Sequence, residues 1–526
     1  MVEVFWTFAR LPAWHWPDVT GGPLWASLAS VETVTEHTLR RINLILLAIT
    51  AFSSLLFLVW RNGLAVPTAE AQTAKSPQLV RTSETSIPKA KPPEGLVPPP
   101  IAPPGSALYT AKRGDSVIAV ARHYLSQTSY LTSSEVAEAI RQSNGEVHGT
   151  FLKAGQTIVI PGVLDAPVVE KSIATPRDFE VRAIYLTGLM AGSDHGIRII
   201  RRWRELGGNA VVFDIKDSDG SINIPFEHPL AGKHHNYIPD LPKFTRFLHS
   251  QNLHAIARIA IFRDEHLVVS HPELAVKSRK TGNPWKENGK LVWTDPSQPK
   301  VQEYDIALAK RAAEAGADEI QFDYVRFPAE GDQKDASFAF QTEHPEWHRS
   351  DVIVDFLKKA HAELQPKGVL LSLDVFGIMA WQRPVDLSHT GQDIVAMAKH
   401  CDVLSPMIYP SHFFGMDGIA HPGDAPEHFI GESMERFQKI TQGSGVVLRP
   451  WLQAFAWRTK TYSPKYIETQ VLTAKNKGGV GFLFWNANND YSKPYAAMPE
   501  MRTVKGQYFR GDEIATTVQA NLTQSK

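Results

Sequence analysis

Cysteine is almost absent from this chain, with Cys401 as the only one among 526 residues. An intramolecular disulfide is therefore excluded, and so are zinc sites that need several cysteines. Neither sign of charge is in excess, because 55 lysines and arginines balance 55 aspartates and glutamates. A chain without a strong net field has no electrostatic reason to bind nucleic acid, and no such partner is expected.

Apolar residues are plentiful, at 43% of the chain, and they include 13 Trp, 13 Tyr and 25 Phe. Together with the length, they allow more than one domain and a large core. Aromatic rings also suit stacking against sugars, although core packing is the simpler explanation for them.

One uncharged run, residues 42–60, reads INLILLAITAFSSLLFLVW and is long enough to cross a bilayer as a helix. Arginines flank both of its ends, so the positive-inside rule favours a cytoplasmic N-terminus only weakly. Cleavage as a signal peptide at Ala69-Glu70-Ala71 is the alternative. We expect a retained single-pass anchor, with 1–41 in the cytoplasm and the folded part of the chain that follows the anchor in the periplasm or outside the cell.

The segment 61–106 is rich in proline and cannot bury enough apolar surface to fold. At ~3.1 Å per residue it spans on the order of 130 Å when extended. It is therefore predicted to be a spacer, through which a membrane-anchored domain reaches a cell-wall layer.

Residues 107–163 resemble a LysM module, a small βααβ glycan-binding domain. The resemblance rests on YTAKRGDSVIAVARHYL from Tyr109, on Asn144-Gly145 and on LKAGQTIVIP from Leu152. From the residues themselves, Asp115 or Ser116 is expected to cap the first helix. The resemblance implies binding to glycans that contain N-acetylglucosamine, such as peptidoglycan. A degenerate module that only spaces the domains is the alternative.

From about Val181, short apolar runs alternate with helical patterns, which is typical of βα units and a parallel sheet. Eight strands are predicted, at 182–187, 210–214, 254–262, 318–323, 369–374, 402–409, 446–453 and 480–485. This number favours a (β/α)8 TIM barrel over 181–500, followed by a polar tail at 501–526. A doubly wound sheet is the alternative, but no Gly-rich phosphate turn follows an early strand.

Polar residues gather where these strands end, the place where such barrels build their active sites. They are Asp214, Arg263, Asp264, Asp323, Asp374, Tyr409, His412, Gln453, Trp485 and Asn486. In the strand 318–323, period-two alternation points Glu319, Gln321 and Asp323 into the barrel. Asp374 ends the neighbouring strand, so it can face Asp323 as the second carboxylate of a glycoside hydrolase.

The same strand ends resemble a bacterial family assigned by similarity as glycoside hydrolases with α-amylase-like barrels. The matching motifs are VRAIYLTG, NAVVFDIKD, ARIAIFRD, ADEIQFDYVRFP, LDVFG, PMIYPSHF, PWLQAF and FLFWNANN, in order over 181–495. The wider superfamily implies Asp323 as nucleophile and Asp374 at the position of the acid. Two departures are Asp374 in place of a glutamate and Gln321 in place of an arginine. Asp214, Asp217, Glu319 and Asp264 therefore remain candidates for the second carboxylate.

Further residues are predicted to bind the polysaccharide by stacking or hydrogen bonding. They are Asp214, Arg326, Tyr409, His412, Gln453, Trp485 and Asn486. Residues 214–220 resemble a calcium loop only superficially, because the remaining spacing and the distal glutamate are missing. No metal and no cofactor are expected. Two other classes stay open, a non-catalytic glycan-binding barrel and a hydrolase of another bond, such as an amidase.

Overall fold

The computed structural model describes residues 101–145, 151–504 and 506–510. The predicted cytoplasmic segment 1–41, the anchor at 42–60 and most of the spacer lie outside these residues, as does most of the tail. Within the described ranges, no helix combines the length and the apolar character needed to cross a membrane.

The first folded part is a small βααβ module. Its strands β1 (Ser106–Thr110) and β2 (Thr157–Pro161) pair antiparallel, and α2 (Val117–Tyr124) and α3 (Ser133–Ser143) come between them in sequence. Ser116 caps α2 by accepting a hydrogen bond from Ala119 N. Asp115 instead accepts hydrogen bonds from Tyr109 Oη at 2.6 Å and Lys112 N at 2.7 Å, which fixes the turn. The predicted order of elements is therefore confirmed for this module.

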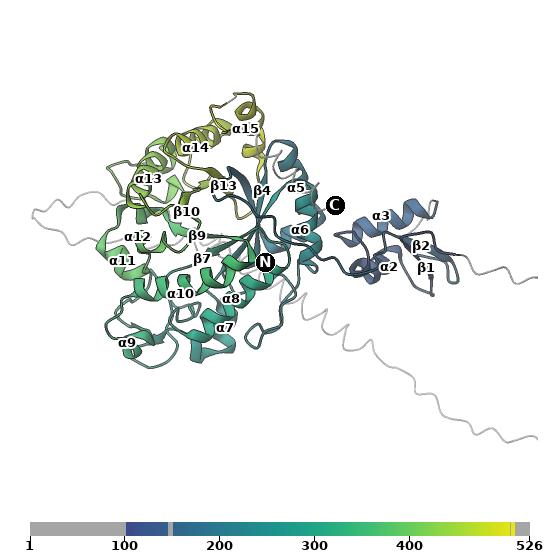
Figure 1. The fold of residues 1–526 in the computed structure, drawn as a ribbon, viewed down its shortest axis with the longest axis horizontal. Coiled ribbons are helices and arrows are strands. Elements are labelled where there is room, and N and C mark those ends of the chain that lie inside the picture. The colour runs from purple at the N-terminus through teal and green to yellow at the C-terminus, as the bar shows by residue number, and fades with distance from the viewer. Residues whose placement is uncertain (1–100, 146–150, 505, 511–526) are drawn as a thin grey trace, which may run out of the picture. The chain divides into compact units, whose positions relative to one another are not determined.

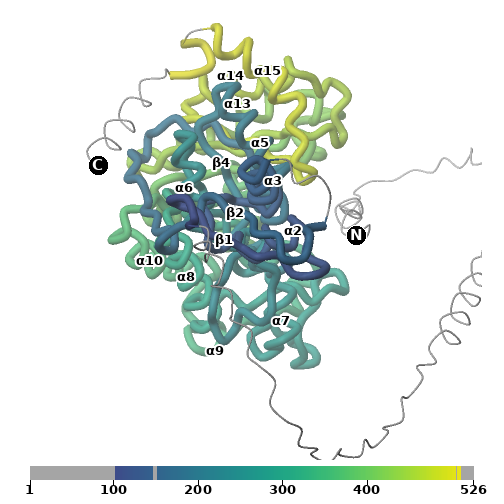
Figure 2. Tube along the Cα trace, turned by 90° about the vertical axis from the view of Figure 1, so that its right-hand side faces the viewer, coloured from purple at the N-terminus to yellow at the C-terminus, as the bar shows by residue number. Residues whose placement is uncertain are grey.

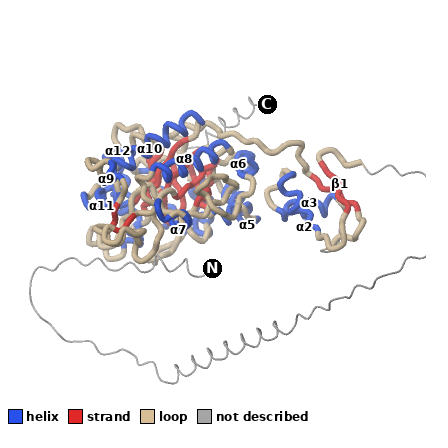
Figure 3. Tube along the Cα trace, turned by 90° about the horizontal axis from the view of Figure 1, so that it is seen from below, coloured by secondary structure: helices blue, strands red, loops and turns tan. Residues whose placement is uncertain are grey.

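The second part is a closed barrel of parallel strands with its helices outside (Figures 1 and 3). The barrel has eight strand positions, and β11 and β12 share the seventh because the strand is interrupted there. In chain order they are β3 (Val181–Leu186), β4 (Ala210–Lys216), β5 (His254–Ala260), β7 (Glu319–Asp323), β9 (Leu370–Phe376), β10 (Val403–Ile408), β11 (Val447–Leu448) with β12 (Trp451–Gln453), and β13 (Gly481–Trp485). Pairing of β9 with β10 closes the ring. The prediction of a TIM barrel is confirmed, and an open doubly wound sheet is excluded.

Helices follow the strands and cover their outer faces. The longer ones are α5 (Asp194–Glu205), α6 (Leu241–Ser250), α8 (Pro299–Glu314), α10 (Arg349–Leu364), α13 (Pro426–Ile440), α14 (Pro464–Asn476) and α15 (Ser492–Thr503). The last three pack side by side (Figure 2). Ser193 and Ser463 cap α5 and α14 by accepting hydrogen bonds from Gly196 N and Tyr466 N. At the start of α10, the Asp351 carboxylate accepts a hydrogen bond from His348 N.

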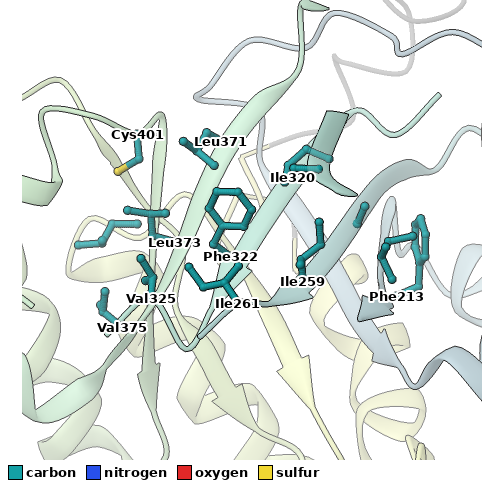
Figure 4. Packing of buried hydrophobic residues seen from close by; sticks show 14 of the residues in the cluster. Phe213, Ile259, Ile261, Ile320, Phe322, Val325, Leu371, Leu373, Val375 and Cys401 are labelled. Carbon is teal, nitrogen blue, oxygen red and sulfur yellow. The ribbon is translucent and has the colours of Figure 1, made fainter. Parts of the chain in front are cut away.

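Successive side chains of each strand point to opposite faces, so β7 has an apolar outer face toward the helices and a polar inner face toward the barrel axis. Ile320 and Phe322 point out from β7 and pack with apolar side chains of the neighbouring strands β5 and β9 (Figure 4). The polar set of β7, Glu319, Gln321 and Asp323, points to the other face and is buried as well. These inward polar groups need partners inside the barrel, since an unpaired buried charge is costly.

At the N-terminal end of β7, Glu319 has such partners. Its carboxylate accepts hydrogen bonds from Arg449 Nη1 at 2.8 and 3.0 Å and contacts His254 Nε2 at 3.1 Å. Burial alone would raise the pKa of Glu319, but Arg449 and His254 outweigh burial and lower this pKa to about 2. The cluster therefore ties β5 and β7 to Arg449, the residue that follows β11.

Replacing Arg449 by methionine should lower the free energy of unfolding by about 3–5 kcal/mol at pH 7, because Glu319 then stays buried without a counter-charge. The pair stabilises the fold above the ordinary carboxyl pKa and loses this effect as pH falls toward about 2. Urea unfolding at pH 7 and pH 4 measures both effects. The double variant Glu319→Gln/Arg449→Met is the control and should recover most of the loss. Equal stability of R449M and the wild type would contradict this role.

Candidate active site

The centre of the barrel mouth is the guanidinium group of Arg258, which β5 places in register with Gln321 of β7. Arg258 Nη1 donates to Asp214 Oδ1 at 2.5 Å, and Nη2 donates to Asp323 Oδ2 at 2.5 Å. Its Nε lies 3.8 Å from Asp374 Oδ2. One cation thus gathers carboxylates from β4, β7 and β9.

Asp323 is the most accessible of the three carboxylates. Its side chain is 10% exposed, against 0% for Asp214 and 1% for Asp374. Its second oxygen, Oδ1, accepts a hydrogen bond from Tyr324 N at 2.6 Å. Tyr324 has φ +54°, a left-handed conformation that costs about 1–2 kcal/mol for a residue other than glycine. Strained backbone of this kind concentrates at functional sites, where the surrounding structure holds it in place.

Asp374 is held in a different environment. Trp451 Nε1 donates to its Oδ1 at 2.6 Å, while its Oδ2 is buried without a hydrogen bond among the described residues. Burial, and after it the negative charge of Asp323, raises the pKa of Asp374 well above its usual range, against the opposing effects of Arg258 and Trp451. General acid catalysis requires a carboxyl group whose environment favours the protonated form. The surroundings of Asp374 meet this requirement, whereas the neighbouring Asp323 is bound by an arginine.

Asp214 is fully buried, and both of its oxygens are occupied. Tyr185 Oη donates to Oδ2 at 2.5 Å, and Arg258 donates to Oδ1. Burial raises the pKa of Asp214 to about 7, although Arg258 acts in the opposite direction. These contacts make Asp214 a group that orients Arg258, and they leave it no oxygen free for the sugar contact that the sequence predicts.

The other candidates for the second carboxylate lie in separate contacts. Glu319 belongs to the cluster with Arg449. Asp264 caps α7 (Glu265–Ser270) and lies 2.9 Å from the buried Lys216. Asp217 is half-buried after β4, and its charge helps to raise the pKa of Asp214. Within the described part of the chain, no group of three or more His, Cys, Asp or Glu side chains is arranged to hold a metal ion.

Aromatic rings line the side of the mouth formed by β10, β12 and β13. Tyr409 lies 5.7 Å from the Trp485 ring and 5.4 Å from His412, between ring centres. Phe455 lies 5.3 Å from Trp485, and Trp457 lies 4.9 Å from His412. The structure therefore brings Tyr409, His412 and Trp485 together in one wall, as their positions at the strand ends predict.

Two of the predicted sugar-binding residues, Gln453 and Asn486, use their side-chain atoms for hydrogen bonds to loop residues instead. Gln453 accepts from Ser411 N at 3.2 Å and donates to Phe455 O and Thr459 Oγ1, both at 2.9 Å. Asn486 donates to Ala454 O and Asp490 O, at 2.6 and 2.9 Å. Both side chains are buried and hold the loops that carry the aromatic wall.

A cavity of about 270 Å³ opens beside this wall. Its lining includes Ser411, Phe414, Arg458 and Thr459, whereas the three carboxylates around Arg258 do not line it. The cavity and the three carboxylates therefore involve different residues.

Two residues of the site were missed from the sequence, Arg258 and Tyr185, and so was the hydrogen bond of Trp451 to Asp374. A signal exists for Arg258, because a charged residue in the middle of the apolar strand 254–260 faces the same side as His254. Tyr185 and Trp451 look like ordinary core aromatics in sequence. Only the hydrogen bonds from Tyr185 Oη and Trp451 Nε1 reveal that each orients a carboxylate.

Comparison with solved structures yields several similar folds. A hypothetical protein from Ruminiclostridium thermocellum ATCC 27405 is 37% identical over 36% of this chain and 97% of its own, with a TM-score of 0.33. The glycoside hydrolase domain of PgaB (BpsB) from Bordetella bronchiseptica is 14% identical over 63% of this chain and 99% of its own, with a TM-score of 0.46. The spore cortex-lytic enzyme SleL from Bacillus megaterium QM B1551 is 13% identical over 74% of this chain and 85% of its own, with a TM-score of 0.35.

No curated protein matches the chain by sequence. A family profile does match, over residues 183–491, which is more than half of the chain and nearly all of the barrel. The prediction of a glycosidase is confirmed at this level, without a sugar or a linkage. The chain belongs to the family described as "putative glycosyl hydrolase domain".

Proposed function

We propose that this protein hydrolyses a cell-wall or extracellular polysaccharide, with Asp323 as nucleophile and Asp374 as general acid. The observation that carries the proposal is the unequal environment of the two carboxylates. Arg258 and Tyr324 N both donate hydrogen bonds to Asp323, whose side chain is 10% exposed. Burial raises the pKa of Asp374, which favours its protonated form.

The spacing of the strands supports a retaining mechanism. Phe322 pairs with Leu373, so Asp323 and Asp374 come next on the same face of adjacent strands. Neighbouring strands lie about 4.8 Å apart, and retaining glycosidases separate their carboxyl groups by about 5–5.5 Å. Asp323 would attack the anomeric carbon while the leaving oxygen takes the proton of Asp374. Water, deprotonated by Asp374, would then displace Asp323 and release the sugar.

The aromatic wall supports binding of a sugar chain at the same mouth. Tyr409, Trp485 and His412 offer ring faces and edges beside the carboxylates, and the adjacent cavity leaves room for a further sugar unit.

Targeting to the envelope rests on the segments before the barrel. The apolar run 42–60 would anchor the chain in the membrane, with the N-terminus in the cytoplasm and the barrel in the periplasm or outside. The proline-rich spacer would give it reach. The small module, with its βααβ order and its LysM-like motifs, would bind peptidoglycan or another glycan that contains N-acetylglucosamine.

One observation favours an alternative, a barrel that binds glycans without cleaving them. Asp374 is only 1% exposed, so its proton must reach the leaving oxygen through a short movement of the side chain or of the β9 end. The alternative and the main proposal differ in whether glycan is released at all.

Replacing Asp323 by asparagine should lower glycan release by about three orders of magnitude or more, because it removes the nucleophile. Reducing-end release from purified sacculi and from secreted polysaccharide measures this, with free amines assayed alongside to detect an amidase. For a retaining enzyme, azide should rescue Asp374→Ala and yield a glycosyl azide of retained configuration. Wild-type protein that binds these glycans and releases nothing would establish the binding alternative.

Replacing Asp374 by asparagine should stabilise the fold at pH 8 while lowering turnover by about 10²–10⁴-fold. The raised pKa of Asp374 means that the folded state favours its proton, so stability falls as pH rises above the ordinary carboxyl range. Thermal unfolding from pH 4 to pH 8 should show a growing advantage of D374N over the wild type. Asp393→Asn, at the cap of α12 (Ile394–Met397), is the control and should show no such growth. A pH-independent difference for D374N would exclude the raised pKa.

Deleting residues 107–163 should reduce co-sedimentation of the protein with insoluble sacculi, while cleavage of soluble glycan fragments stays unchanged. The expected reason is that the module supplies binding and the barrel supplies chemistry. Unchanged co-sedimentation would mean that the module only spaces the domains.

A further inference from the structure

Arg326 is a buried cation beside the proposed catalytic pair. It follows the end of β7 and is 9% exposed. Its Cζ lies 4.3 Å from the centre of the Phe376 ring, 4.8 Å from that of Trp293 and 5.2 Å from that of Tyr324. The three rings hold the planar guanidinium group from several sides, so its orientation is fixed before any ligand arrives.

Among the described residues, this arginine forms no ion pair with a carboxylate. The fully buried cations of the barrel do: Arg449 pairs with Glu319, and Lys216 pairs with Asp264 and Asp305. Within the described part of the chain, Arg326 donates one hydrogen bond, from Nη1 to Phe327 O at 3.0 Å. The carboxylates of Glu287, Asp323 and Glu330 act on it only through space. A buried charge left in this state is unusual and calls for an anion.

The free side of Arg326 faces the solvent. Its Nε and Nη2 atoms make no hydrogen bond with the described residues, and neither atom is fully buried. Solvent can therefore reach both atoms. The neighbouring Trp293 Nε1, in contrast, is buried without an acceptor. Arg263 lies on the same Tyr324 ring, with its Cζ 5.7 Å from the ring centre. Arg263 and Arg326 thus place two positive charges against one ring at the strand end.

That spot adjoins the reacting groups. Phe376, the ring closest to Arg326, comes two residues after Asp374 on β9 and therefore shares its face of the strand. Tyr324, the ring between Arg263 and Arg326, directly follows Asp323. An anion bound at Arg326 would belong to the sugar at the scissile bond or to its immediate neighbour.

We propose that Arg326 binds a carboxylate of the polysaccharide, so that the substrate is an acidic glycan. A guanidinium fork matches the two oxygens of a carboxylate, and a fixed fork loses little freedom on binding. The carboxylate can belong to a uronic acid or to the lactyl ether of N-acetylmuramic acid in strands without stem peptides. This inference rests on the proposed glycosidase function and adds its substrate class.

Matched acidic and neutral polymers test the inference with the full-length protein in detergent. One pair is polygalacturonate and its methyl ester, and the other is amidase-treated peptidoglycan strands before and after amidation of the lactyl carboxylates. Binding is measured on the Asp323→Asn background and cleavage on the wild-type background, each with and without Arg326→Gln or Arg326→Lys. Arg436→Gln is the matched control, because Arg436 also stacks on a ring, 4.8 Å from Trp381, but lies on α13 and pairs with Glu432.

The wild type should prefer the acidic member of at least one pair, and R326Q should reduce that preference by about 10- to 100-fold. R326K should keep part of it, since lysine keeps the charge and loses the fork. A folding defect would lower binding and cleavage of the acidic and the neutral polymer equally, so the ratio of acidic to neutral would not change. No preference in either pair, or a ratio that R326Q leaves unchanged, overturns the inference. A different result would separate the two proposals. If no variant cleaves any polymer, but binding still prefers the acidic polymer and this preference depends on Arg326, the proposed hydrolase function is wrong and the acidic-glycan binding site stands.

Discussion

The mouth of this barrel depends on one guanidinium group. Asp214, Asp323 and Asp374 come from different strands and converge on Arg258, with ion-pair contacts of 2.5, 2.5 and 3.8 Å. Two like charges about 4 Å apart repel by about 4 kcal/mol at the effective dielectric of a protein. Arg258 opposes the burial that raises the pKa of Asp214 and of Asp374. It also holds the Asp323 carboxylate at the barrel mouth by a direct hydrogen bond.

Secondary structure and barrel topology follow from the sequence because alternation and helix caps are local signals. Asp323 is found in the same way, since a strand with Glu319, Gln321 and Asp323 on one face must point them inward. Arg258 escapes this reasoning. Its role depends on the register between β5 and β7, which sets it opposite Gln321, and register across separate strands has no local signature.

The predicted sugar-binding residues fall into two groups, and the sequence cannot tell the groups apart. A polar residue at a strand end signals a site, yet loops at the same place need hydrogen-bond partners for their own backbone. Gln453 and Asn486 meet that need, while Tyr409, His412 and Trp485 form the aromatic wall. Residue type and position are the same in both cases. The difference lies in which atoms are already occupied, and that appears only in three dimensions.

Burial by itself does not assign a carboxyl its role here. Glu319 and Asp374 are both buried inside the barrel, yet the pKa of the first falls to about 2 and that of the second rises. Glu319 receives two hydrogen bonds from Arg449 and one contact from His254, so its charge is compensated. Asp374 receives one hydrogen bond, from Trp451, and leaves one oxygen without a partner. Both oxygens of Glu319 are paired, which makes the cluster at the start of β7 structural. At the strand ends, Asp374 keeps one oxygen without a hydrogen bond among the described residues. This difference in pairing, and not burial, separates the two carboxyls.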